Sequence, residues 1–325
     1  MRNDVYRSME DIYDAPLLPE RFDPYTILSC LKHTGETAVY LLARDGARFI
    51  LKYAAGQARD ALSEECLFLD RFSQQFDFLP SAVLFIQTGT ESFLLREYIE
   101  GETLHDLVDR NGPFEEREAA RLTLLLLNSL ETLHTQSPPV IHRDIKPENL
   151  VLTPTGKLKM IDMGTVRSYS GVKSKDTVYA GTPAVAAPEQ FGYAQSDKRT
   201  DIYAAGMLLL FLLTGGYERD LYAVADVSRG ARRVLEKCLA FDPDRRYQDT
   251  KAMRAALLRV LRTGVKTTRT RVAALCALAF ILGAVCGVAV KTYLPPDAPA
   301  AQITAPQPVV FAEPLLELAV REFLG

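Results

Sequence analysis

The chain has 325 residues, of which 48% are hydrophobic and 24% are charged, and its formal net charge is −3. This length and hydrophobic content suffice for one large two-lobed core with residues left over. Without a basic excess, the composition argues against nucleic acid as a partner.

The N-terminal extension, residues 1–22, is polar and acidic. No apolar segment follows a basic one there, so we expect no secretory signal and a body that stays in the cytoplasm. Five cysteines stand at unrelated spacings, which indicates reduced, mostly buried thiols and excludes a disulfide framework or a four-cysteine metal site. They are Cys30, Cys66, Cys238, Cys276 and Cys286.

The first predicted elements are three β-strands, at residues 25–28, 38–42 and 48–53, followed by a helix over residues 58–72. In this helix Glu64 and Glu65 compete for the buried face. Counting from Glu65, apolar residues fall three, four and seven positions on, whereas the seventh position after Glu64 is Arg71. The helical period therefore predicts a buried Glu65 and an exposed Glu64.

Residues 93–101 predict a further strand that runs into a connecting segment. Two helices are then expected, at residues 102–110 and 115–135, and the leucines of the second should belong to the core. These leucines are Leu122, Leu125, Leu126, Leu130 and Leu133.

The loop from His142 to Asn149 reads His-Arg-Asp-Ile-Lys-Pro-Glu-Asn, which places an acid, a cation and an amide close together. In phosphoryl transfer an Asp orients the attacking hydroxyl and accepts its proton, and an Asn five residues later holds magnesium. Asp144 and Asn149 have that spacing, and Asp162-Met163-Gly164 follows. Residues 150–152 and 158–161 read as a hairpin that presents Asp162.

These motifs resemble those of the eukaryotic-type, or Hanks-type, serine/threonine protein kinases, in particular the membrane-anchored bacterial ones. The resemblance covers residues 25–261. It implies an α+β, two-lobed protein kinase fold with a β-rich N-lobe and a helical C-lobe, followed by a single transmembrane helix. It further implies that Lys146 contacts the transferred phosphate and that Asn149 and Asp162 hold Mg2+. Met163 replaces the family's phenylalanine, which an adaptable methionine can do within apolar contacts.

The same resemblance assigns ATP contacts in the N-lobe. Lys52 would pair with the α and β phosphates and with Glu65. Val39 would lie beside the nucleotide, after a loop that usually carries three glycines for close phosphate approach. Those three positions hold Lys32, Thr34 and Thr37, and only the intervening Gly35 is a glycine. This departure predicts either a weakened ATP affinity or an unusual loop shape.

Adenine would hydrogen-bond the backbone near Glu97 and Ile99, which puts Arg96 at the gatekeeper position behind the adenine pocket. A buried guanidinium needs an anion. Arg96 is therefore expected either to reach Glu65 or to turn to solvent, and a strand offset by one residue that exposes Arg96 is the alternative.

Residues 165–187 resemble an activation segment that ends in the motif Ala187-Pro188-Glu189. Thr182 is expected to contact Asp144 and Lys146. The phosphorylation candidates are Thr177, our first choice, and Ser174, Ser170 and Ser168. A phosphate on one of them would pair with Arg143 and order the segment.

Two later motifs imply structural support for the site. Asp201 opens an apolar stretch similar to the central kinase helix, whose Asp braces the catalytic loop. Arg246 ends a motif whose arginine pairs with the carboxylate of the Ala-Pro-Glu sequence, here Glu189.

Residues 263–271 are basic and residues 272–290 carry no charge. Nineteen apolar residues at about 1.5 Å each span close to 30 Å, which is enough for a bilayer core. The positive charge before this segment predicts a single-pass protein of the cell membrane with its kinase domain in the cytoplasm and its tail outside. The Pro- and Ala-rich tail, residues 291–325, weakly resembles the cap of a leucine-rich-repeat domain, and a partner-binding or disordered tail is the alternative.

The sequence thus predicts a kinase domain over residues 23–262, with lobes 23–100 and 101–262. It would transfer the γ-phosphoryl group of ATP to Ser or Thr of cytoplasmic proteins and to its own activation segment, which leaves room for a homodimer that acts in trans. One alternative is a pseudokinase scaffold, suggested by the missing glycines. Another is a small-molecule phosphotransferase, which the Ala-Pro-Glu motif disfavours.

Overall fold

The computed structural model describes residues 18–168, 183–192, 195–220 and 227–262. The chain divides into two compact units, Met1–Lys266 and Thr267–Gly325, and every described residue belongs to the first. No helix within the described ranges is long and apolar enough to cross a membrane. The predicted membrane segment, residues 272–290, lies outside them, as do Cys276 and Cys286.

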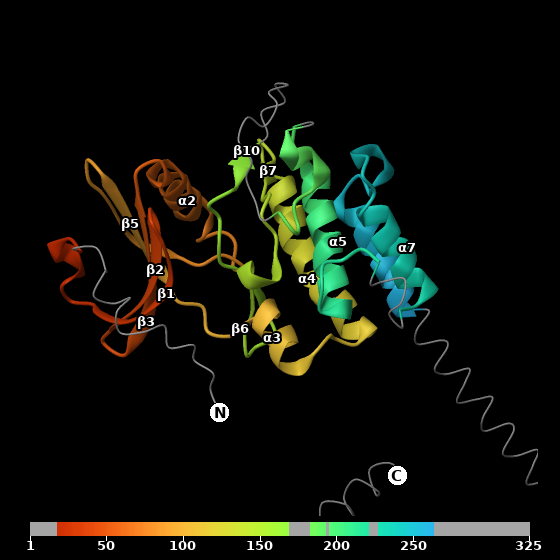
Figure 1. The fold of residues 1–325 in the computed structure, drawn as a ribbon, viewed down its shortest axis with the longest axis horizontal. Helices are drawn as coiled ribbons and strands as arrows, with labels where there is room; N and C mark the ends of the chain where they lie inside the picture. Colours follow the sequence, from red (N-terminus) through yellow and green to blue (C-terminus); the bar gives the residue numbers. More distant parts are fainter. Residues whose placement is uncertain (1–17, 169–182, 193–194, 221–226, 263–325) are drawn as a thin grey trace, which may run out of the picture. The chain divides into compact units, whose positions relative to one another are not determined.

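The N-lobe is an antiparallel sheet of five strands in the order β1-β2-β3-β5-β4, drawn in red and orange in Figure 1. A short 3-10 helix, η1 (Glu20–Phe22), precedes it. The strands are β1 (Thr26–Thr34), β2 (Thr37–Arg44), β3 (Ala47–Ala55), β4 (Ala82–Gln87) and β5 (Glu91–Glu97). Helix α2 (Ala58–Phe72) lies against this sheet and has the bounds that its periodicity predicts.

Alternation along β3 and β5 separates the two faces of the sheet. Leu51, Phe93 and Leu95 join the apolar cluster on the face away from α2. Lys52 is paired with Leu94, which belongs to the cluster shared with α2. Because directly opposed residues point to the same face, Lys52 lies on the α2 side, where the functional groups gather.

The C-lobe is helical, with α4, α5 and α7 side by side in Figure 1. Its helices are α3 (Leu104–Asn111), α4 (Glu116–His134), α5 (Lys198–Thr214), α7 (Arg229–Cys238) and the helix of residues 250–262. Every residue from Thr200 to Leu212 of α5 is buried. A helix that is apolar on all sides must be surrounded, so α5 is the central packing element of this lobe.

Short strands and 3-10 helices carry the loops of the C-lobe. Strands β6 (Glu102–Thr103), β8 (Leu150–Leu152) and β9 (Leu158–Met160) form one small sheet, and β7 (Val140–Ile141) pairs with β10 (Arg167–Ser168). The 3-10 helices are η2 (Pro147–Asn149), η3 (Pro188–Phe191) and η4 (Pro243–Arg245).

Two local predictions need correction. Residues 102 and 103 form strand β6 rather than helix, because the Thr103 hydroxyl caps α3 by accepting from the Asp106 N–H at 3.0 Å. Leu125 is half-buried, and Leu127 takes the core position instead. The three described cysteines are free thiols, and two of them, Cys30 and Cys238, are buried while Cys66 is half-buried, which agrees with the expectation of mostly buried thiols. Helix α5 begins at Lys198, capped by Asp197, so that Asp201 lies in its first turn.

Gly101 connects the two lobes in a conformation that only glycine adopts easily. Its φ is +143°, and a Cβ at this position would collide with the Leu152 carbonyl of β8. The connection between the lobes therefore runs in direct backbone contact with β8, the strand that follows the catalytic loop.

Candidate active site

Lys52 joins two acidic groups that are far apart in the sequence. Its Nζ lies 2.7 Å from both carboxylate oxygens of Glu65 and 2.9 Å from Oδ1 of Asp162. Glu65 is buried on α2 and Glu64 is exposed, which confirms the choice made from the helical period. The three side chains thus link β3, α2 and the loop after β9.

The charge states of this group follow from the contacts. Burial opposes the charge on Lys52, but Asp162 and Glu65 outweigh burial and raise its pKa, so the ammonium stays protonated. Burial also opposes ionisation of Asp162, yet the charge and hydrogen bond of Lys52 hold the pKa of this carboxyl below its ordinary value. Asp162 is therefore an ionised carboxylate at neutral pH. Its side chain is 41% exposed, so it remains accessible to a ligand.

Arg96 is the fourth charge of the cluster. It is only 4% exposed, so the expectation that it turns to solvent is wrong, as is the strand offset that would expose it. Ion pairing with Glu65 is wrong as well, because no carboxylate of the described residues lies within 4 Å of the guanidinium. Nη1 instead donates to the Glu97 carbonyl at 3.1 Å, and Nε is buried without a partner. Burial lowers the pKa of Arg96, while Glu65, Asp162 and Glu97 raise it, which shows that the acids are within electrostatic range.

The catalytic loop brings its acid, cation and amide together around Asp144, which is 9% exposed. Lys146 Nζ lies 3.3 Å from Asp144 Oδ2. Asn149 donates from Nδ2 to the backbone oxygen of Asp144 at 3.0 Å and to Oδ2 at 3.1 Å. Because the amide nitrogen of Asn149 is used in this way, its Oδ1 is the atom left for a metal ion.

A backbone hydrogen bond ties this loop to the Lys52 cluster. The Ile161 N–H donates to the Asn149 carbonyl at 2.9 Å, directly before Asp162. Met163 follows and is 2% exposed within the main core, in the place expected for it. The two side chains assigned to magnesium, Asn149 and Asp162, therefore belong to neighbouring segments.

Asp201 fixes the backbone of the catalytic loop through two hydrogen bonds. Its carboxylate is fully buried and accepts hydrogen bonds from the N–H groups of His142 and Arg143, both at 2.9 Å. Arg143 has a φ of +69°, a conformation that costs free energy in a residue with a side chain. The two hydrogen bonds to Asp201 offset that cost and fix the turn that presents Asp144.

His134 is a functional residue that sequence reasoning missed. It lies at the end of α4, is nearly buried, and places Nε2 2.8 Å from Oδ2 of Asp201. Burial alone would raise the pKa of Asp201, but the hydrogen bond and charge of His134 lead the contacts that hold it below its ordinary value. In the sequence, the one indication was a histidine at the end of a leucine-rich helix. That pattern does not indicate that Asp201 is its partner.

The hairpin expected to cover the nucleotide turns at Gly35 and Glu36, between β1 and β2. Gly35 has an ordinary φ and nothing near its Cβ position, so its backbone does not require glycine. The hydroxyls of Thr34 and Thr37 lie 2.6 Å apart across the hairpin. These side chains close the tip at two of the positions where the family has glycine. On β2, Val39 lies opposite Lys52 and on the same face.

The connection that should bind adenine presents Glu97 and Ile99. The Glu97 N–H donates to the Ser81 carbonyl at 2.9 Å, and its own carbonyl accepts from Arg96. Ile99 is buried. An adenine amino group would thus share the Glu97 carbonyl with a guanidinium, which the sequence alone did not indicate.

Most of the activation segment lies outside the described residues, among it Ser170, Ser174, Thr177 and Thr182. Ser168 is in β10, opposite Val140 of β7. Arg143, expected to pair with a phosphate there, donates from Nε to the Thr165 carbonyl at 2.8 Å, at the start of the segment.

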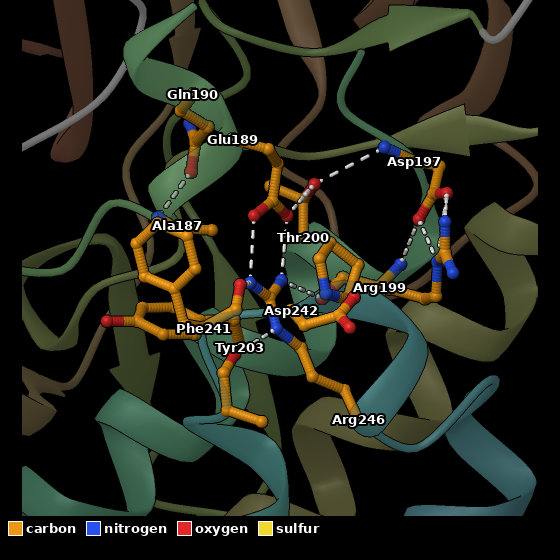
Figure 2. A network of polar contacts seen from close by, with 12 residues as sticks. Ala187, Glu189, Gln190, Asp197, Arg199, Thr200, Tyr203, Phe241, Asp242 and Arg246 are labelled. Atoms are coloured by element: carbon orange, nitrogen blue, oxygen red, sulfur yellow. Dashed lines mark hydrogen bonds and ion pairs between the residues drawn. The ribbon is translucent and has the colours of Figure 1, made fainter. Parts of the chain in front are cut away.

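The far end of the segment is held by a buried ion pair between Glu189 and Arg246 (Figure 2). The two guanidinium Nη atoms lie 2.7 and 2.8 Å from the two carboxylate oxygens, and the Thr200 hydroxyl donates to Glu189 at 2.8 Å. Both charged side chains are at most 4% exposed. The pairing that the late sequence motif implied is therefore present.

A family model described as the protein kinase domain matches residues 38–220, more than half of the chain. The chain belongs to this protein kinase family. Its relatives are bacterial serine/threonine kinases, which makes it a kinase domain of the Hanks type.

Three relatives illustrate the similarity. Serine/threonine-protein kinase PknB of Mycolicibacterium smegmatis is 31% identical over 194 residues, which are 53% of this chain and 31% of the relative. PknB of Mycobacterium leprae is 29% identical over 277 residues, 74% of this chain and 44% of the relative. PknL of Mycobacterium tuberculosis is 36% identical over 128 residues, 39% of this chain and 32% of the relative. The chain thus spans less than half the length of these relatives.

Replacing Arg96 with methionine is expected to weaken the binding of metal-free ATP to the kinase domain by about tenfold. Lys52, Arg96, Glu65 and Asp162 sum to zero charge, and removing one cation leaves a net negative group facing the phosphates. Titration with a fluorescent ATP analogue in EDTA measures the change. Arg44→Met, which removes an exposed cation paired with Asp45, should bind like the wild type. Equal affinities for Arg96→Met and wild type would show that this charge does not reach the phosphates.

His142 is expected to make the kinase domain less stable as the pH falls below about 6.5. The side chain is 1% exposed, and burial lowers its pKa against the charges of Asp201 and Asp144. Between the folded and unfolded pKa values only the unfolded chain takes up the proton. The contribution of His142 to the free energy of unfolding is therefore complete above the pKa that this histidine has in the unfolded chain. It declines as the pH falls below that pKa, by at most about 1.4 kcal/mol per pH unit.

Urea unfolding at pH 7.5, 6.5 and 5.5 measures this slope. His142→Phe should flatten it, and His33→Gln, at an exposed histidine, should leave it unchanged. A slope that His142→Phe does not alter would assign the titration to another group.

Proposed function

We propose that the chain is a membrane-anchored serine/threonine protein kinase, which transfers the γ-phosphoryl group of ATP to Ser or Thr hydroxyls of cytoplasmic proteins. The observation that carries this proposal is that the fold assembles two groups of contacting side chains. In the first, Lys52 contacts Glu65 and Asp162, and in the second, Asp144 contacts Lys146 and Asn149. The names of the bacterial relatives support the same reaction.

The donor set fits Mg2+. Asp162 supplies an ionised carboxylate and Asn149 an amide oxygen, which are the hard ligands that Mg2+ accepts. No group of three His, Cys, Asp or Glu side chains among the described residues forms a metal site of its own. Two protein ligands suit an ion that completes its shell with water and the phosphates of ATP. When bound, Mg2+ would neutralise charge that develops on the phosphates.

Each residue of the site would have a separate role in phosphoryl transfer. Lys52, held by Glu65, would position the α and β phosphates, and Val39 would lie beside the nucleotide. Asp144 would orient the substrate hydroxyl and accept its proton as the oxygen attacks the γ phosphorus and ADP leaves. Lys146, beside Asp144, would stabilise the negative charge on the transferred group. Such catalysis works mainly by positioning and electrostatics.

The organisation around the kinase domain is part of the proposal. Residues 23–262 would form the domain, residues 263–271 a basic juxtamembrane segment, and residues 272–290 a single membrane helix, with residues 291–325 outside the cell. The support is the absence of charge from 272 to 290 and the cations before it. Autophosphorylation would modify Thr177 first, within a homodimer, and order the segment through Arg143.

A pseudokinase scaffold is the second candidate, favoured by one observation. The side chains of Thr34 and Thr37 close the hairpin tip, where the family has glycines that let backbone amides approach phosphate. A scaffold of this kind would bind partners without turnover.

The test is transfer of labelled γ-phosphate from ATP and Mg2+ to a generic protein substrate by the purified full chain, with the Asp144→Asn chain as background. Label on Ser and Thr that depends on Mg2+ and on Asp144 is expected. A wild-type chain that binds ATP but transfers nothing, even after phosphorylation by a partner kinase, would favour the scaffold.

A further inference from the structure

Exposed cations gather on the last two helices of the C-lobe. Arg229, Arg233 and Lys237 are spaced four residues apart on α7, so they share one face of that helix, and all three are exposed. Arg259 and Arg262 are exposed near the end of the helix of residues 250–262. We call the four arginines of this group, Arg229, Arg233, Arg259 and Arg262, the basal patch.

The two helices run antiparallel, which brings these arginines to one end. A Cβ on Gly230, near the start of α7, would lie 3.1 Å from Cγ2 of Val260. Near the other end of the pair, the sulfur atoms of Cys238 and Met253 are 3.6 Å apart. The start of α7 therefore lies beside the end of the last helix, as the blue part of Figure 1 shows. The described chain ends at this same place.

Three of the four basal-patch arginines are not paired with any acid that the structure describes. In the described part of the chain, Arg229, Arg233 and Arg262 have no carboxylate within 4 Å, whereas several arginines elsewhere do. The paired arginines include Arg44, Arg48, Arg110 and Arg121. Residues 227–262 contain ten Lys and Arg but four Asp and Glu, in a chain whose net charge is −3.

Acids at the start of α4 also lie near the patch. Glu116 accepts the Ser228 N–H at 2.7 Å, and Glu118 is paired with Arg121. Glu115 lines a shallow hollow with Leu261. Glu236, exposed on α7 three residues after Arg233, is a fourth acid on this face. Against these four acids stand the four arginines of the patch, and Arg117 and Arg121 of α4. The face remains net positive.

The chain itself limits how far this face can be from a membrane. Nine residues, 263–271, separate Arg262 from the uncharged segment that begins at Val272. Fully extended, they span about 35 Å at most, because each residue reaches roughly 3.3–3.6 Å. A domain of this size is about 45 Å across, on the order of 2.5 radii of gyration. The tether is thus shorter than the domain, and it carries Lys266, Arg269 and Arg271.

We propose that the basal patch docks on the anionic lipid headgroups of the bilayer, so that the kinase domain rests on the membrane by the base of its C-lobe. This rests on the proposed membrane helix at residues 272–290. Each Lys or Arg near an anionic surface strengthens binding by about fivefold. The four arginines act together with the tether, and the N-lobe is held away from the lipid.

The test compares the full chain in nanodiscs of phosphatidylcholine alone with discs that also contain phosphatidylglycerol. An arginine-selective dicarbonyl reagent, read by mass spectrometry, reports which arginines are covered. Arg229, Arg233 and Arg262 are expected to react at least about fivefold more slowly in the anionic discs. Arg71, exposed on α2, should react equally in both. High salt should abolish the difference, because the headgroup charges are then screened.

The variant Arg229→Gln with Arg233→Gln separates docking from general crowding near a disc. Arg262 should lose most of its protection in this variant, whereas the matched change of Arg48 and Arg71 to glutamine should leave Arg262 protected. Equal reactivity of the patch arginines in both lipids would overturn the docking while leaving the membrane helix intact. A chain that alkaline carbonate washes from the discs would overturn both proposals.

Discussion

Replacing Arg246 with methionine should lower the free energy of unfolding of the kinase domain by about 3–5 kcal/mol. Removing one partner of a buried ion pair leaves the other charge without compensation. Glu189 would keep only the Thr200 hydroxyl, at 2.8 Å, while remaining 4% exposed. Urea unfolding of residues 1–266, the unit that contains every described element, measures the loss.

Besides the ion pair with Glu189, Arg246 donates three hydrogen bonds to backbone carbonyls. Nε donates to the Ala240 carbonyl at 2.8 Å, Nη1 to Arg199 at 3.2 Å and Nη2 to Phe241 at 2.9 Å, in addition to Glu189. The guanidinium carbon also lies 4.9 Å from the ring centre of Tyr203. All five N–H donors therefore have acceptors. Lysine, with three donors and no planar fork, should recover only part of the stability in Arg246→Lys.

Two comparisons test the cause of this loss. Arg245→Met, one residue away, removes a side chain that is 82% exposed and 4.0 Å from its acid, and should change stability by less than about 0.5 kcal/mol. In the double variant of Arg246→Met and Glu189→Leu, the unpaired charge is gone but three backbone carbonyls lose a donor, so stability should return in part only. Full stability in Arg246→Met alone would show that the pair contributes little.

The parts of the fold that could be predicted are those with a local signal. The bounds of α2 and the choice of Glu65 over Glu64 followed from a helical period sustained over 15 residues. Strand β6 has two residues, too few for any period, and depends on pairing with β8 about fifty positions later. Leu125 was misplaced because a helix rich in leucine on several faces does not show which of them packs against α5.

The candidate site divides in the same way. Asp144, Asn149 and Asp162 stand in motifs whose order and spacing the chemistry requires. The contact of His134 with Asp201 spans 67 positions and has no motif of its own. The environment of Arg96 could not be predicted from the sequence. Arg96 is a buried cation near Lys52, Glu65 and Asp162, and these three residues come from separate elements that only the fold brings together. Interactions between such charges can be identified only from the three-dimensional structure.

Asp144→Asn is expected to reduce the rate of phosphoryl transfer by about 10²–10⁴-fold, the range that a positioned general base contributes. The amide keeps the shape of the carboxylate, and one oxygen can still accept from Asn149 Nδ2, which lies 3.1 Å from Oδ2. It cannot take a proton from a substrate hydroxyl, and it removes the charge 3.3 Å from Lys146. The loss should therefore appear in kcat.

Binding and stability separate this effect from damage to the site. Asp201 holds the loop through backbone groups of His142 and Arg143, which the substitution leaves in place, so ATP affinity and unfolding should stay near wild type. Glu148→Gln removes an exposed acid of the same loop and is the matched control, with an unchanged rate. If Asp144→Asn kept more than a tenth of the wild-type rate, the proton would have to leave by another route, and Asp144 would orient the loop rather than the hydroxyl.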